Sequence, residues 1–161
     1  MAKKAKEEKT NVMRLLEQAK VEYSHYCYAD TDAISGVEVA TVLGQNVDKV
    51  FKTLVTVGKS KEHYVFVIPV AEELDLKKAA NGVGEKSIAM VKSKELLGLT
   101  GYIHGGCSPI GMKKVFQTVI HQSAEAYDTI IFSGGKIGYQ VEVSLDGLRK
   151  VIPFTLSDII V

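Results

Sequence analysis

Two apolar runs separated by a short polar turn constrain the fold of this chain more than any other feature. Residues 51–57 alternate as Phe-Lys-Thr-Leu-Val-Thr-Val, and residues 64–70 are almost wholly apolar. The polar turn 58–62 lies between them, so the pattern predicts a β-hairpin with a half-buried first strand. Pro69 indicates an edge or the end of the second strand, because proline has no N–H to donate to a neighbouring strand. The chain is therefore expected to be built on a sheet.

Helices and further strands are predicted around this hairpin. Thr10 or Asn11 caps a helix with one apolar face, and Ser35 with Glu38 is a capping-box pattern that opens a second helix. With their caps, the predicted helices cover residues 10–19, 35–43, 74–80, 93–97 and 144–151, with a further turn at 46–50. The predicted strands outside the hairpin cover residues 21–28, 115–120, 129–132 and 139–143. No internal repeat or linker is visible, so we expect a single α+β domain on a mixed sheet.

Size and composition limit the possible functions. At 161 residues the chain has the length of one domain, and 46% apolar with 24% charged residues is ordinary for a globular protein. The formal net charge of +1 means that the protein as a whole does not attract polyanions, so any contact with nucleic acid must come from local patches. Residues 1–9 are interpreted as a charged flexible tail, and residues 10–161 as the folded domain.

Cysteine usage and hydropathy indicate the compartment. Cys27 and Cys107 are too few for a disulfide framework, and neither they nor the histidines show metal-ligand spacing. The N-terminus lacks the apolar stretch of a secretory signal, and no apolar run reaches membrane-spanning length. We therefore expect a soluble, cytoplasmic protein without membrane contact, in a reducing compartment.

Lys52 is the first candidate for chemistry, because it stands in the predicted half-buried strand. A lysine there either keeps its proton and binds an anion or a carbonyl group, or loses it through desolvation and acts as a base or nucleophile. The alternative is that its stem packs on the sheet while its ammonium group reaches water. Thr53 points to the opposite face of a regular strand, although its backbone groups remain available to a ligand.

Two glycine-rich segments are candidates for the rest of a pocket. Residues 101–111 combine several glycines with Pro109, which predicts a shaped loop whose N–H groups bind a carbonyl, a carboxylate or a phosphate. A tight turn between helix and strand is the plainer interpretation. Ser133, followed by Gly134 and Gly135, stands at the end of a predicted strand, where its hydroxyl either binds a ligand or stabilises the turn. Neither segment has the spacing of a nucleotide-binding motif.

Cys107 and His104 stand close enough in sequence to suggest a thiol nucleophile with a histidine base. No acidic residue is placed to orient the histidine, and a small buried thiol is the commoner role of a lone cysteine. A cysteine-dependent hydrolase is therefore the least favoured interpretation.

The runs 50–54, 67–69, 74–78, 99–111 and 133–136, taken together, resemble the YbaK/EbsC family of bacterial aminoacyl-tRNA deacylases. This family is related to the editing domain of prolyl-tRNA synthetase. The resemblance covers nearly the whole chain and implies a YbaK/prolyl-tRNA synthetase-associated domain fold, with a mixed, barrel-like sheet, flanking helices, no metal and no cofactor. It also implies an enzyme of translation fidelity that removes cysteine from mischarged Cys-tRNA(Pro), and from Cys-tRNA(Cys).

The resemblance assigns roles to individual residues. It implies that Lys52 is the catalytic lysine. The implied substrate-binding residues are Tyr26, Thr53, Gly105, Gly106, Cys107, Ser108, Pro109, Ser133 and Gly134. Tyr28 is close enough in sequence to compete with Tyr26 for the place of the pocket tyrosine. Close relatives commonly carry aspartate seven residues after the serine, where this chain has Gln140, so a general base is not expected there.

The expected chemistry is simple, because an aminoacyl ester is already activated and needs positioning and oxyanion stabilisation rather than a catalytic triad. We expect Lys52 and the N–H groups of residues 105–108 to hold the aminoacyl carbonyl and the terminal ribose. The resemblance implies attack by the thiol of the substrate, giving a cyclic thiolactone, and water attack is the competing route. The implied partners are aminoacyl-tRNA and, in a ternary complex, prolyl-tRNA synthetase.

Two other functions remain open from the sequence. One is an Ala-tRNA(Pro) deacylase, which would have the same fold and a different pocket. The other is a non-catalytic module that binds aminoacyl-tRNA or the synthetase.

Overall fold

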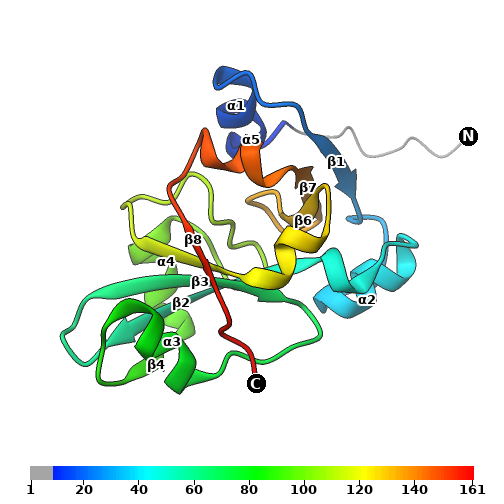
Figure 1. Cartoon of the computed structure of the whole chain (residues 1–161). Coiled ribbons are helices and arrows are strands. Elements are labelled where there is room, and N and C mark those ends of the chain that lie inside the picture. The colour runs from blue at the N-terminus through cyan, green and yellow to red at the C-terminus, as the bar shows by residue number, and fades with distance from the viewer. Residues whose placement is uncertain (1–8) are drawn as a thin grey trace, which may run out of the picture.

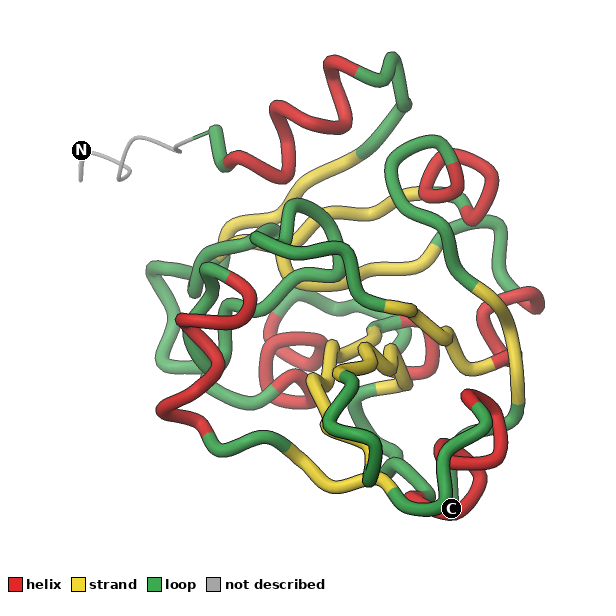
Figure 2. The backbone as a smooth tube through the Cα atoms, turned by 90° about the vertical axis from the view of Figure 1, so that its left-hand side faces the viewer, coloured by secondary structure: helices red, strands yellow, loops and turns green. Residues whose placement is uncertain are grey.

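The computed structural model describes residues 9–161, which form two β-sheets with helices around them (Figure 1). An antiparallel sheet has the order β1-β7-β6, with β1 at Ser24–Cys27, β7 at Tyr139–Val143 and β6 at Ile130–Ser133. The five-stranded sheet has the order β4-β2-β3-β5-β8, with β4 at Ile88–Met90, β2 at Phe51–Gly58, β3 at His63–Pro69, β5 at Gln117–His121 and β8 at Thr155–Ser157. Figure 2 shows strands in the middle of the molecule with helices around them, and further strands that reach its outer edge.

Three helices begin at their predicted caps, Thr10, Ser35 and Ser144, whereas the helix expected from Leu74 begins at Leu76 after Asp75. The side chain of Thr10 accepts a hydrogen bond from the N–H of Met13 at the start of α1, and Ser35 with Glu38 forms the complete capping box of α2. The helices are α1 at Asn11–Gln18, α2 at Gly36–Val42, α3 at Leu76–Val83, α4 at Ser93–Thr100 and α5 at Leu145–Arg149, with short 3₁₀ turns η1 at Val47–Lys49 and η2 at Gln122–Ala126.

The predicted hairpin is formed by β2 and β3, whose antiparallel register runs from Phe51 opposite Pro69 to Val57 opposite His63. On its other edge β3 pairs with β5 in parallel, and β5 pairs with β8 in parallel, so the sheet is mixed. β3 is buried on both faces, because Val65 and Val67 enter one core cluster while Phe66 and Ile68 enter another. Burial on both faces explains the almost unbroken apolar run of this strand.

The two sheets meet at the start of β2. Val50, the residue before this strand, forms an isolated bridge with Ile131 of β6. The larger core cluster contains Phe51 and Val55 of β2 together with Phe132 of β6. The first half of β2 therefore lies beside the small sheet.

The predicted α+β class and mixed sheet are confirmed, although the strands divide between two sheets rather than one. The pattern does not predict β4 or β8, because three residues are too few to show an alternation. Residues 1–8 of the predicted charged tail lie outside the described residues, and Lys9 forms an ion pair with Glu17 at 2.9 Å. Within residues 9–161 no helix combines the length and the apolar character that crossing a membrane requires.

Candidate active site

The first half of β2 has a free edge. β4 pairs only with Thr56, Val57 and Gly58, and no strand of residues 9–161 is paired with residues 52–54 on that side, although β6 bridges to Val50. The carbonyl oxygen of Val55 faces this edge, because it accepts from the N–H of Val91 at 3.2 Å. Since alternate residues of an antiparallel strand direct both backbone groups to the same side, the N–H and C=O of Thr53 also face the free edge.

A cavity of about 290 Å³, here called the edge cavity, follows this free edge. Five consecutive residues of β2, 51–55, line it. Because successive side chains of a strand point to opposite faces, the cavity must run along the strand rather than over one face of the sheet. The remaining lining residues are Tyr28, Ile34, Ser35, Gly36, Val39, Val50, Val70, Met90, Val91, Leu96, His104, Gly105, Cys107, Phe132, Ser133 and Gln140. The volume suits a small group at the end of a larger ligand.

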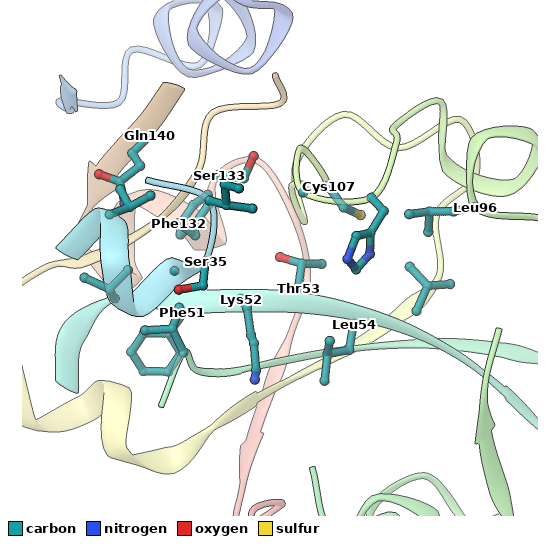
Figure 3. A pocket seen from close by; sticks show the side chains of 18 of the residues that line it. Ser35, Phe51, Lys52, Thr53, Leu54, Leu96, Cys107, Phe132, Ser133 and Gln140 are labelled. Atoms are coloured by element: carbon teal, nitrogen blue, oxygen red, sulfur yellow. The ribbon is translucent and has the colours of Figure 1, made fainter. Parts of the chain in front are cut away.

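Lys52 and Thr53 approach the cavity from opposite sides of β2. In Figure 3 the stem of Lys52 leaves the strand away from Thr53, whose side chain lies on the same side as Ser133 and Cys107. The ammonium group of Lys52 makes no hydrogen bond or ion pair among residues 9–161. The hydroxyl of Thr53 is buried beneath the cavity lining, closed off from solvent, and has no hydrogen-bond partner among residues 9–161.

The glycine-rich loop brings backbone donors to the same cavity. Gly105 and Cys107 line it, and Gly105 has a φ of +89°, which glycine adopts without strain. The N–H of Gly106 is used within the loop, since it donates to the carbonyl of Ile103 at 3.0 Å. No partner is found within residues 9–161 for the N–H groups of Gly105, Cys107 or Ser108. The loop can therefore offer neutral donors to a ligand.

Three other residues predicted to bind substrate lie outside the lining. Ser108 is fully buried, and its hydroxyl accepts from the N–H of Ile110 at 3.3 Å. Pro109 lines a different, apolar cavity. The N–H of Gly134 donates to the carbonyl of Tyr139 at 2.9 Å in the turn between β6 and β7. These residues, like Gly106, shape the loops around the edge cavity and do not line it.

Ser133 lines the cavity as predicted. Its hydroxyl oxygen accepts from the N–H of Gly135 at 3.1 Å, which leaves the hydroxyl proton available to a ligand. The Cys107 thiol lines the cavity too, but burial raises its pKa to about 12. A thiol with that pKa stays protonated at neutral pH, so the structure gives no support to a cysteine nucleophile.

Of the two candidate tyrosines, the structure places Tyr28 in the lining of the edge cavity and Tyr26 outside it. Tyr28 lines the edge cavity, whereas the hydroxyl of Tyr26 donates to the carboxylate of Glu142. This hydrogen bond is the largest cause of the raised pKa of Tyr26. The Glu142 carboxylate also accepts from Lys49 at 2.7 Å, so Tyr26 belongs to a polar network that joins η1 to β7.

Gln140 lines the cavity next to Ser133, which it faces across the β6–β7 pair. Its Oε1 accepts from Nε2 of Gln45 at 2.8 Å. Sequence reasoning misses Gln45, because the two glutamines are 95 residues apart and no local pattern connects them.

The edge cavity carries basic and neutral groups and no acid. Within the described residues 9–161, its lining residues include Lys52 and His104 and no aspartate or glutamate. Within residues 9–161 no cluster of three or more histidine, cysteine, aspartate or glutamate side chains is arranged to hold a metal ion. The arrangement is suited to a neutral or partly anionic group, such as a carbonyl that gains negative charge during a reaction.

Comparison with solved structures identifies the class of fold. One similar structure is a candidate trans-editing enzyme for prolyl-tRNA synthetase, with a TM-score of 0.79 and 22% identity, and the match covers 94% of this chain and 98% of that one. Another is a hypothetical protein with a TM-score of 0.82 and 19% identity, covering 94% of this chain and 100% of that one. At these identities the likeness concerns the fold alone.

Comparison of sequences identifies the family. The family model for the aminoacyl-tRNA editing domain matches residues 31–151. The chain is 48% identical over 152 residues to EbsC of Enterococcus faecalis, covering 94% of this chain and 93% of that protein, which is named as a candidate Cys-tRNA(Pro)/Cys-tRNA(Cys) deacylase. The chain belongs to the aminoacyl-tRNA editing domain family, as its resemblance to the YbaK/EbsC proteins predicts. It is thus an enzyme of the aminoacyl-tRNA deacylase class.

Proposed function

We propose that this protein is a trans-editing deacylase that removes cysteine from Cys-tRNA(Pro) and from Cys-tRNA(Cys). The observation that carries the proposal is the edge cavity, which combines, among residues 9–161, one lysine, unused backbone donors and no acidic residue. The name of the relative from Enterococcus faecalis, at 48% identity, supports cysteine as the amino acid.

The cavity suits an ester that needs little activation. A substrate that contacts both Lys52 and the glycine-rich loop must lie across the free edge of β2, because these groups approach from opposite sides. We assign Lys52 to one side of the terminal aminoacyl ester, and the N–H groups of Gly105 and Cys107 to the other. Together they hold the aminoacyl carbonyl and the terminal ribose and stabilise the negative charge that develops on the carbonyl oxygen.

The nucleophile in this proposal is the thiol of the bound cysteine. Its sulfur forms a bond to the carbonyl carbon, the ester C–O bond breaks, and the thiol proton ends on the released ribose oxygen, which leaves a cyclic thiolactone. The cavity supports this route because its lining in the described part of the chain offers no carboxylate to activate water, and because the Cys107 thiol is protonated at neutral pH. Chemistry that depends on the substrate thiol also distinguishes cysteine from alanine better than apolar contact, which discriminates one methylene group by about 1–3 kcal/mol.

The proposed partners are aminoacyl-tRNA and prolyl-tRNA synthetase. With a formal net charge of +1 the protein has little general attraction for tRNA, so we propose that the synthetase holds the tRNA in a ternary complex. The mixed-charge residues at the N-terminus are proposed to contribute phosphate contacts, which salt-dependent binding would reveal.

Multiple-turnover deacylation of three substrates tests the function. Cys-tRNA(Pro), Cys-tRNA(Cys) and Ala-tRNA(Pro) are incubated with catalytic amounts of protein, and release of the amino acid is followed. Rapid loss of cysteine from tRNA supports the proposal. Loss of alanine alone would identify an Ala-tRNA(Pro) deacylase, and stoichiometric binding without turnover would identify a binding module.

A further inference from the structure

Gln140 presents an unused hydrogen-bond donor to the edge cavity. Its side chain is 5% exposed and lines the cavity beside Ser133. Its Oε1 is occupied by Nε2 of Gln45 at 2.8 Å, and its Nε2 has no hydrogen-bond partner among residues 9–161. This Nε2 is not among the polar atoms sealed from solvent, so it faces the open space of the cavity.

The pairing with Gln45 determines which end of the Gln140 amide faces the cavity. Oε1 of Gln45 is buried and has no partner. If both carboxamides were rotated by 180°, Nε2 of Gln45 would occupy that buried place, and its two N–H donors would be unsatisfied there. The observed arrangement leaves only one acceptor unsatisfied at the same place. The observed orientation therefore has the lower cost, and it directs Nε2 of Gln140 inward.

Gln45 itself is held in position. Its N–H donates to the carbonyl of Ala40 at 2.8 Å, at the end of α2. The next turn, η1, is attached to β7 by the ion pair between Lys49 and Glu142 at 2.7 Å. Gln45, which orients Gln140, therefore lies in a segment that is held to α2 on one side and to β7 on the other.

We propose that Nε2 of Gln140 donates a hydrogen bond to the ester carbonyl oxygen as negative charge develops on it, and that Gln45 is a positioning residue that keeps this donor turned inward. The inference rests on the proposed function. A carboxylate at this place would repel the developing oxyanion and an attacking thiolate, whereas a neutral amide attracts both. An amide does not titrate, so its contribution to the rate is independent of pH.

Two substitutions of Gln45 distinguish its role in orienting the Gln140 amide from a role in packing alone. In Gln45→Lys the introduced ammonium group is a donor, so it keeps Oε1 of Gln140 occupied and Nε2 turned inward. In Gln45→Glu the introduced carboxylate is an acceptor, so the Gln140 amide must turn over and present its oxygen to the cavity. Gln45 is only half-buried, so both charged side chains can reach solvent.

The readouts are kcat and KM on Cys-tRNA(Pro), at pH values about one unit either side of neutrality. Loss of one donor to an oxyanion lowers kcat about a hundredfold to a thousandfold, so we expect a fall in that range for Gln45→Glu and for Gln140→Leu, with little change in KM. Gln45→Lys is expected to stay within about twofold of wild type, because the donor is retained. The ratio of each variant to wild type should be the same at both pH values, and urea unfolding confirms that each variant is folded. Equal activity of the two Gln45 variants would overturn the proposal.

Nitrogen NMR of isotope-labelled protein without substrate tests the orientation separately from the function. The Gln140 side-chain amide is assigned by its absence in Gln140→Leu. In Gln45→Glu its N–H should become hydrogen-bonded and exchange more slowly with solvent than in wild type. An unchanged resonance would refute the role of Gln45 in orienting the Gln140 amide. This result does not depend on activity, so it can be read even if the wild-type protein deacylates none of the three aminoacyl-tRNAs and the proposed function fails.

Discussion

The side chains of Lys52 and Thr53 leave β2 on opposite sides, and both residues line the edge cavity. Successive side chains of a strand point to opposite faces, so a cavity lined by neighbouring residues is not confined to one face of the sheet. The free edge of β2 between its pairing with β4 and the bridge at Val50 provides that geometry. It makes the strand itself, with its backbone groups, part of the candidate site.

Thr53→Val should separate function from stability. The Thr53 hydroxyl is buried and unpartnered, so its replacement by a methyl group is expected to raise the free energy of unfolding by about 1 kcal/mol. If the hydroxyl binds substrate, kcat/KM for Cys-tRNA(Pro) falls about tenfold in the same variant. Thr56→Val is the matched control on the same strand, because the hydroxyl of Thr56 donates to the carbonyl of Tyr64 at 3.0 Å and Thr56 does not line the cavity. The control should lose stability and keep activity, and the reverse pattern would contradict the assignment.

Tyr26→Phe and Tyr28→Phe should behave differently. Tyr26→Phe removes the hydrogen bond to Glu142 and is expected to cost about 1–2 kcal/mol of unfolding free energy with kcat/KM unchanged. Tyr28→Phe changes the cavity wall and is expected to raise KM with little effect on stability. Urea unfolding and steady-state deacylation measure the two effects. A loss of activity confined to Tyr26→Phe would restore the assignment based on sequence.

Cys107→Ala should retain deacylation within about twofold, because a thiol with a pKa of about 12 is not the nucleophile. The raised pKa also affects stability. Above the ordinary pKa of a thiol, about 8.5, the unfolded chain loses the Cys107 proton while the folded protein keeps it, so the unfolding free energy falls as pH rises towards 12. Cys107→Ala is expected to flatten this part of the stability curve. Inactivation by Cys107→Ala, with the protein still folded, would instead favour the cysteine-dependent hydrolase.

Thiol dependence of the reaction can be tested on the substrate. tRNA(Pro) charged with 2-aminobutyrate carries a side chain close in size to that of cysteine but has no sulfur. Under the proposed route this ester should be deacylated at about the rate of the uncatalysed background, since the nucleophile is absent. Mass spectrometry of the cysteine reaction should detect the thiolactone before it hydrolyses. Equal rates for the two esters would establish attack by water.

The sequence predicts those parts of the fold that depend on neighbouring residues. The hairpin of β2 and β3, the cap at Thr10 and the capping box at Ser35 follow from local spacing, and all three are present. The division into two sheets depends on which strands meet in space, such as the pairing of β1 with β7. No local pattern carries that information.

The candidate site likewise has residues that the sequence predicts and residues whose place depends on contacts between distant parts of the chain. Lys52, the glycine-rich loop and Ser133 belong to recognisable motifs, and the structure brings them to one cavity. The choice between Tyr26 and Tyr28 depends on Glu142, which lies 116 residues from Tyr26. The inward amide of Gln140 depends on Gln45, and the role of the Thr53 backbone depends on where β4 ends. These contacts arise only once the chain has folded.

The most direct test of the central claim compares Lys52→Ala with Lys77→Ala in multiple-turnover deacylation of Cys-tRNA(Pro). Lys77 is an exposed lysine of α3 that does not line the edge cavity, so its variant controls for the loss of a positive charge. We expect Lys52→Ala to lower kcat/KM about a hundredfold or more, because Lys52 is the only lysine that lines the cavity among residues 9–161, and Lys77→Ala to remain close to wild type. Full activity of a folded Lys52→Ala protein would contradict the account.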